Sequence, residues 1–229
     1  MLDHKVIEQG YHAGKISELF ENLEEIGKFS EDLINLSVDK SKYYTYRHNV
    51  NEPGWPQLEN KLEISQIPER RKLVEENGLT VFQQWYETTH ITQEFNPIFE
   101  FFQKTAATMA FKIYDELNET NIHHIDSFTL FEKDDFIKEH TDGANPGRLC
   151  VVLIYLSDPA MYHDDGGKLI ISENQVRTEV LPVRGNYVIL DFTKHDIVHS
   201  VESVKNNFKR FCYIDFIYNR DKKTNEHKY

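Results

Sequence analysis

An unbroken apolar run, LCVVLIYL, occupies residues 149–156. A short run of this kind, rich in β-branched and aromatic residues and preceded by Gly147, is typical of a β-strand. Two further runs have the same character: residues 186–192 read NYVILDF, and residues 209–218 read KRFCYIDFIY. These three runs predict a strand-rich core in the C-terminal half of the chain.

Shorter strand-like runs surround these three from about residue 121 onward. The predicted strands lie at residues 125–131, 135–140, 148–156, 168–172, 177–181, 186–192, 197–204 and 209–218. Glycine-rich breaks at residues 143–147, 164–167 and 184–186 separate several of them. Short strands at this close spacing predict an antiparallel sandwich or barrel such as a jelly-roll, that is, a double-stranded β-helix.

The chain before residue 121 has a helical pattern instead. Apolar residues recur at helical spacing over 16–26 and over 97–119, and residues 68–77 form a short run between Pro68 and Gly78. We expect the long stripe within 97–119 to pack on the sheet. Residues 43–50 look like an additional strand. The whole chain is then one domain, with a helical and edge-strand part over about 1–120, the β-core over about 121–218 and a polar tail over 219–229.

The composition restricts the class of partner. The net charge is −12 and the pI is about 5.4, so nucleic-acid phosphates would repel the chain, and binding to a membrane surface is disfavoured for the same reason. The N-terminus has no apolar signal segment, and no run is long enough to span a bilayer. Cys150 and Cys212 lie in apolar runs, which predicts two buried free thiols in a reducing, cytoplasmic environment.

A metal site is indicated by three residues. His140 and Asp142 are two positions apart at the end of a strand-like run, so both side chains point to the same side of an extended chain. His199, at the end of another run, is the best candidate for a third ligand. Two imidazoles and one carboxylate form the facial triad of non-haem iron(II) oxygenases. His195 and the adjacent pair His123 and His124 are expected at the surface or behind the ligands.

Residues 130–216 resemble the prolyl 4-hydroxylase-like branch of the iron(II)- and 2-oxoglutarate-dependent oxygenases. The similarity is carried by six pieces in the family's order. They are the strand 136–142 with the first two ligands, the strand 148–157 ending Tyr-Leu-Ser, the Gly-Gly-Lys-Leu turn at 166–169, the Pro-x-x-Gly entry at 182–185, the His-x-Val-x-x-Val segment at 199–204, and Arg210.

The resemblance implies roles for two further residues. Arg210, 11 residues after His199, stands where the family places a basic residue for the far carboxylate of 2-oxoglutarate, and an arginine fork suits that group. Lys209 is the alternative and would point to the opposite face. Tyr155 aligns with a tyrosine that helps to hold the cosubstrate. Ile214 departs from the small polar residue that the family often has at that position.

The implied activity is a dioxygenase reaction. Iron(II), 2-oxoglutarate and O2 are the expected cofactors and cosubstrates, with ascorbate open as an addition. The enzyme would release succinate and CO2 and hydroxylate an unactivated C–H bond, either of a peptidyl residue such as proline or of a free amino acid or other small metabolite. Two rival readings are a non-catalytic jelly-roll binding module and a metal-dependent hydrolase that uses the same triad. The oligomeric state stays open.

Overall fold

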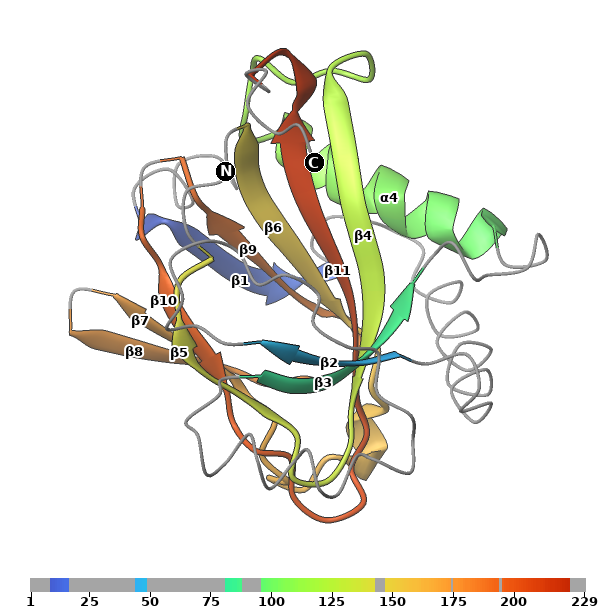
Figure 1. The fold of residues 1–229 in the computed structure, drawn as a ribbon, viewed down its shortest axis with the longest axis vertical. Coiled ribbons are helices and arrows are strands. Elements are labelled where there is room, and N and C mark those ends of the chain that lie inside the picture. Colours follow the sequence, from blue (N-terminus) through green and yellow to red (C-terminus); the bar gives the residue numbers. More distant parts are fainter. Residues whose placement is uncertain are drawn as a thin grey trace.

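The strands in the described part of the chain form an 11-stranded antiparallel sheet that folds over into two layers (Figure 1). The larger layer has the order β1-β9-β6-β11-β4, and the smaller layer has the order β5-β10-β7-β8. Strand β3 joins the layers because it pairs with both β4 and β5, and β2 pairs with β3. The elements are β1 (Tyr11–Lys15), β2 (Tyr44–His48), β3 (Val81–Glu87), α4 (Asn96–Phe111), β4 (Ile122–Phe131), β5 (Phe136–His140), β6 (Arg148–Tyr155), β7 (Leu169–Glu173), β8 (Val176–Val180), β9 (Asn186–Asp191), β10 (Val198–Val201) and β11 (Arg210–Asn219).

This computed structural model describes residues 9–16, 44–48, 81–87, 96–142, 147–173, 175–193 and 195–222. Within these ranges, no helix is long and apolar enough to cross a membrane. The expected helix over 16–26, apart from Ile16, and the expected helix over 68–77 lie outside the described residues. The single-domain organisation and its internal boundaries stay a prediction.

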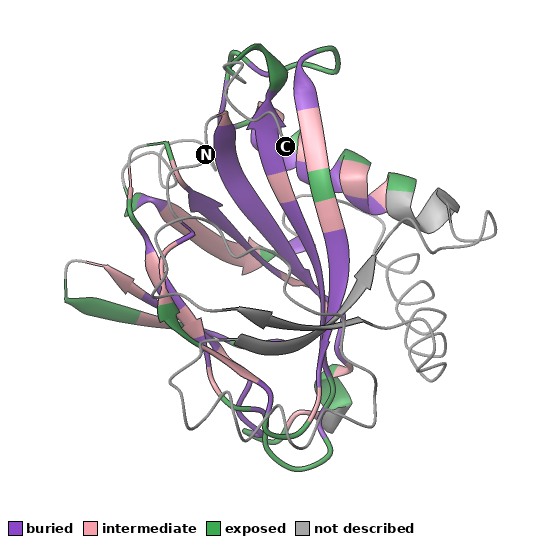
Figure 2. Cartoon of the chain, in the orientation of Figure 1, coloured by how far each residue is buried: buried purple, intermediate pink, exposed green. Residues whose placement is uncertain are grey.

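The larger layer is buried on both faces, so its central strands are apolar along almost their whole length. Figure 2 shows β6 buried from end to end, and most of β9 and β11 buried as well. Alternate residues on β11 point to opposite sides: Phe211, Tyr213 and Ile217 pack in a cluster beneath α4, whereas Cys212 and Ile214 pack in a second cluster between the layers.

Helix α4 covers the outer face of the larger layer. Its apolar stripe is fully buried at Phe102, Ala106 and Met109, and the Phe102 ring stacks on Tyr213 with centroids 5.1 Å apart. The regular helix ends at Phe111, earlier than the expected 119. Turn-type hydrogen bonds from residues 112 and 113 to Met109 and Ala110 follow, and they keep the later apolar residues of the stripe buried.

The predicted fold class is confirmed, and each of the eight strands expected after residue 121 is present. The expected strand at 43–50 corresponds to β2. Strands β1 and β3 were not expected. Cys150 and Cys212 are buried free thiols, as predicted.

A β-bulge at the start of β6 changes which side of the layer Arg148 faces. Along most of the pair, β6 and β11 run in regular register, with Ile217 opposite Cys150, but Tyr218 then pairs with Arg148 and not with Leu149. Leu149 and Cys150 consequently both belong to the cluster beneath the helix. The extra residue turns Arg148 to the opposite side, toward the rings of Phe216 and Tyr218.

Candidate metal centre

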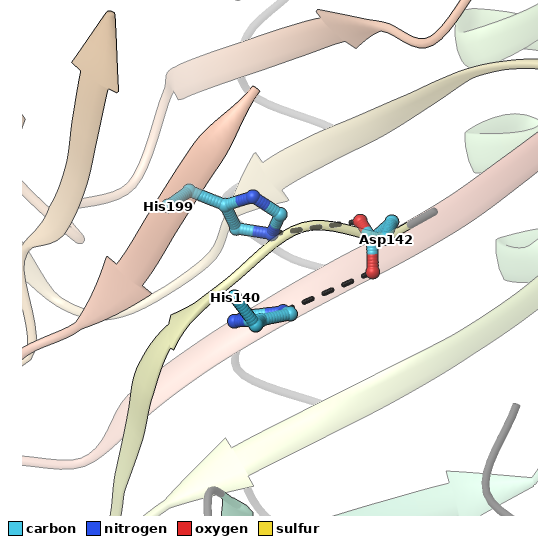
Figure 3. A group of neighbouring side chains, drawn as sticks. All are labelled: His140, Asp142 and His199. Atoms are coloured by element: carbon cyan, nitrogen blue, oxygen red, sulfur yellow. Dashed lines mark ion pairs between the residues drawn. The ribbon is translucent and has the colours of Figure 1, made fainter. Parts of the chain in front are cut away.

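Three side chains from two neighbouring strands of the smaller layer converge at one point (Figure 3). His140 is the last residue of β5, and Asp142 lies just beyond that strand's end. His199 is on β10 and is the Cα partner of His140 in the antiparallel pair. One potential ligand atom from each of the three lies within 4.8 Å of the others. The structure thus brings together all three residues predicted as ligands.

The Asp142 carboxylate faces both imidazoles. Its two oxygens lie 3.8 Å from Nε2 of His140 and 3.5 Å from Nε2 of His199. Asp142 and His199 are 6% and 7% exposed, so these groups are largely removed from water. Burial, followed by the nearby His199, lowers the pKa of His140 and favours its neutral form, which is the form that can bind a metal.

Hydrogen bonds to the backbone orient both rings. Nδ1 of His140 lies 2.9 Å from the carbonyl of Lys138, and Nδ1 of His199 lies 3.1 Å from the carbonyl of Ile197. A carbonyl only accepts, so in each neutral ring Nδ1 carries the proton and Nε2 keeps its lone pair. Both lone pairs are then available on the side of the Asp142 carboxylate. This donor set, two imidazole nitrogens and one carboxylate, fits an iron(II) ion.

Arg210 lies buried in the space between the layers. It is 2% exposed, and its guanidinium lies over the rings of Phe131 and Tyr155 at 4.7 and 5.1 Å from their centroids. Its Nε–H donates to the Gly167 carbonyl at 2.9 Å. Among the described residues, no carboxylate pairs with it. A buried cation without an anion is costly, so this arrangement suits an anionic ligand.

Gly167 is required for this close approach. Its φ of +69° is in the left-handed region, and a Cβ atom there would lie 3.1 Å from Val204 and 3.3 Å from Cδ of Arg210. The Gly166–Gly167 turn that was singled out in the sequence therefore packs against Arg210 through Gly167.

Tyr155 stands beside Arg210. Its hydroxyl accepts from Nη2 of Arg210 at 3.4 Å, a long hydrogen bond. Burial raises the pKa of Tyr155, so the phenol stays protonated and can donate to an anion bound beside Arg210. Lys209, the alternative cation, is 45% exposed, and its Nζ lies 3.9 Å from Oε1 of Glu132. It therefore points toward solvent and away from Arg210.

The other histidines in the described part of the chain do not join the cluster. His195 pairs with Glu173 at 3.3 Å. His124 is 18% exposed and also lies outside the cluster. Its Nδ1 lies 2.6 Å from the fully buried Asp215 carboxylate on the helix side of the larger layer. The two residues are diagonal neighbours on paired strands, because Asp215 on β11 is opposite Asp126 and His124 on β4 is opposite Ile217.

Arg148 is not among the residues predicted for the site, yet it contacts one of them. Its Nη1 donates to the backbone carbonyl of Asp142 at 3.0 Å. The sequence does not reveal this contact because it depends on the β-bulge. Regular alternation along β6 would have turned the Arg148 side chain to the helix side.

Residues 120–218 match the family described as "2OG-Fe(II) oxygenase superfamily". No curated protein sequence matches the chain. Similar solved structures include a prolyl hydroxylase from Trichoplax adhaerens in complex with a hypoxia inducible factor peptide fragment (TM-score 0.68, 12% identity, covering 100% of this chain and 92% of that chain). A prolyl-4-hydroxylase from Pseudomonas putida is also similar (TM-score 0.64, 12% identity, 96% and 97% coverage).

A third similar structure is AviO1 from Streptomyces viridochromogenes Tue57 (TM-score 0.57, 14% identity, covering 97% of each chain). At these identities the structural likeness concerns the fold. The family match over the β-core, together with the prolyl-hydroxylase fold, confirms the resemblance found in the sequence. Residues 120–218 therefore match the 2OG-Fe(II) oxygenase superfamily and the chain has the prolyl-hydroxylase fold, which together support a 2-oxoglutarate-dependent dioxygenase that uses iron(II), 2-oxoglutarate and O2.

Proposed function

We propose that this enzyme hydroxylates an unactivated C–H bond, with His140, Asp142 and His199 as the iron ligands and Arg210 as the anchor for 2-oxoglutarate. The observation that carries the proposal is the buried Arg210 guanidinium, which lies over Phe131 and Tyr155 and pairs with no carboxylate among the residues that the structure describes. A metal-dependent hydrolase or a binding module with the same triad has no need for a buried cation there. A dicarboxylate cosubstrate does need one.

The roles of the protein groups follow from their hydrogen bonds. The carbonyls of Lys138 and Ile197 hold the two imidazoles as Nε2 ligands. Iron(II) held by these ligands would supply the O2 activation that couples oxidative decarboxylation of 2-oxoglutarate to oxidation of the second substrate. Arg210 and the Tyr155 hydroxyl would bind the far carboxylate, which leaves the keto-acid end free to face the metal.

The second substrate is proposed as a class. The similar structure from Trichoplax adhaerens contains a peptide fragment, which supports a peptidyl residue such as proline as the target. A free amino acid or another small metabolite is the second option. The excess of acidic residues argues against nucleic acid, whose phosphates would be repelled.

Two measurements test the function. Anaerobic addition of iron(II) and 2-oxoglutarate should produce a weak charge-transfer band in the visible, and this band should be absent from Asp142→Ala. O2 should then be required for succinate release. Turnover of a substrate without O2 would instead identify a hydrolase. Screening peptide and metabolite collections for a product heavier by one oxygen atom would identify the substrate class.

A further inference from the structure

Asp142 occupies a position that the β-sheet does not hold. Strand β5 ends at His140, so the ladder with β10 that fixes the two histidines does not extend to the carboxylate ligand. A ligand beyond the end of a strand needs another contact to keep it in place, because metal affinity depends on how firmly each ligand is held.

Arg148 supplies such a contact. It is 8% exposed, and Nη1 donates to the Asp142 backbone carbonyl at 3.0 Å. The guanidinium is itself held: Nε and Nη2 both donate to the hydroxyl of Tyr218, at 3.0 and 2.8 Å, and the plane lies 4.5 Å from the centroid of Phe216. The β-bulge at Leu149 directs the side chain to this side of the layer.

We propose that Arg148, anchored by Tyr218, is a positioning residue that holds Asp142 in its metal-binding place. The inference rests on the proposed function, since it takes Asp142 as a ligand. Arg148 would link the larger layer, which carries the 2-oxoglutarate anchor, to the one ligand that lies outside the strands of the smaller layer.

The direction of the change in metal affinity when Arg148 is removed distinguishes a positioning role from a purely electrostatic one. Removing a cation close to a metal site lowers the repulsion felt by a divalent ion and should therefore tighten binding. Removing a clamp on a ligand should weaken binding, by roughly 10- to 100-fold for a residue that orients a ligand. The two roles predict changes in opposite directions.

The test is cobalt(II) titration of the metal-free full-length protein, followed by visible ligand-field absorption. Arg148→Met keeps the length of the side chain but loses the donors, and it should weaken cobalt(II) binding roughly 10- to 100-fold. Its bands should shift toward those of Asp142→Ala. Tyr218→Phe removes only the anchoring hydroxyl and should weaken binding several-fold, in the same direction.

Arg177→Met provides the matched control, because Arg177 is 59% exposed and pairs with Glu179 on the outer strand β8. It should bind cobalt(II) as the parent does. At saturating iron(II), the 2-oxoglutarate concentration for half-maximal succinate release should be unchanged in Arg148→Met, since the anchor at Arg210 is intact.

Each failure has a distinct meaning. If Asp142→Ala binds cobalt(II) like the parent, the metal assignment is wrong and this inference is lost with it. If Asp142→Ala binds weakly while Tyr218→Phe and Arg148→Met bind as tightly as the parent or more tightly, only the positioning role is overturned. Should Arg148→Met fail to fold, Tyr218→Phe carries the test alone.

Discussion

His140 and His199 are Cα partners on the antiparallel strands β5 and β10, and their ring centroids lie 4.3 Å apart. The ladder hydrogen bonds of the sheet therefore set the separation of the two imidazoles before any metal arrives. A site that is preorganised in this way spends little of its binding free energy on ordering its ligands.

The first prediction concerns the ligands. Alanine at His140, Asp142 or His199 should each abolish binding of stoichiometric iron(II) and stop succinate release, because a facial site has three protein ligands and each variant removes one. Anaerobic iron titration measures this. His195→Ala is the control, since His195 pairs with Glu173 outside the cluster. Loss of iron in His195→Ala, with retention in His199→Ala, would reverse the assignment of the third ligand.

The second prediction concerns the anchor for the cosubstrate. Arg210→Ala should raise the 2-oxoglutarate requirement roughly 100-fold or more, because breaking a buried ion pair costs on the order of 3–5 kcal/mol. Iron binding should survive. Initial rates of succinate release against 2-oxoglutarate concentration give the answer.

Lys209→Ala is the neighbouring control. Lys209 is 45% exposed and pairs with Glu132, so its removal should leave the 2-oxoglutarate requirement unchanged. A large effect in Lys209→Ala with none in Arg210→Ala would show that the wrong cation has been assigned.

The third prediction isolates the Tyr155 hydroxyl. Tyr155→Phe keeps the buried ring over Arg210 and removes one donor to the bound carboxylate, so the 2-oxoglutarate requirement should rise by roughly 10-fold, about 1.4 kcal/mol. Tyr213→Phe removes a buried hydroxyl on the opposite face, which contacts Asp126 and Asp215. It should leave the requirement unchanged, and equal effects in the two variants would contradict a specific role for Tyr155.

The fourth prediction concerns pH and the His124–Asp215 pair. Burial alone lowers the pKa of His124, but the hydrogen bond and charge of Asp215, with the charge of Asp126, outweigh both burial and Arg220 and raise it. A raised pKa in the folded state stabilises the protein fully below the unfolded value, about 6.5, and this contribution is lost as pH rises through the folded-state pKa.

His124→Gln should therefore lower the free energy of unfolding by about 1–3 kcal/mol at mildly acidic pH, and the difference from the parent should shrink at alkaline pH. Urea unfolding at a series of pH values measures it. His163→Gln, at an exposed loop position, should show no such trend. A difference that grows with rising pH would refute the charged pair.

Most of the core could be predicted because its signals are local. Strands such as β6 and β9 are apolar runs between turn residues, and His140 and Asp142 are two positions apart at the end of a strand-like run. Strand β1 could not be found this way. Its five residues include Gly14, whose hydrogen atom faces the Tyr187 ring, and only pairing with β9 makes it a strand.

Two other features depend on the backbone of distant segments. Arg148 faces the site because of the bulge opposite Tyr218, which no periodicity at residues 148–156 reveals. The end of α4 at Phe111 was not predicted because Ile113 and Leu117 continue the helical spacing of apolar residues. Both are buried, but they lie in turns that follow the helix.

The two cysteines occupy opposite faces of the larger layer. Cys150 packs in the cluster beneath α4, and Cys212 packs in the cluster between the layers. Burial raises the pKa of both thiols, that of Cys212 to about 12, and only a thiolate reacts readily with alkylating reagents. Each thiol is therefore unreactive toward alkylating reagents until its own side of the sheet opens. The rate of Cys150 alkylation therefore reports release of the helix, and the rate of Cys212 alkylation reports separation of the two layers.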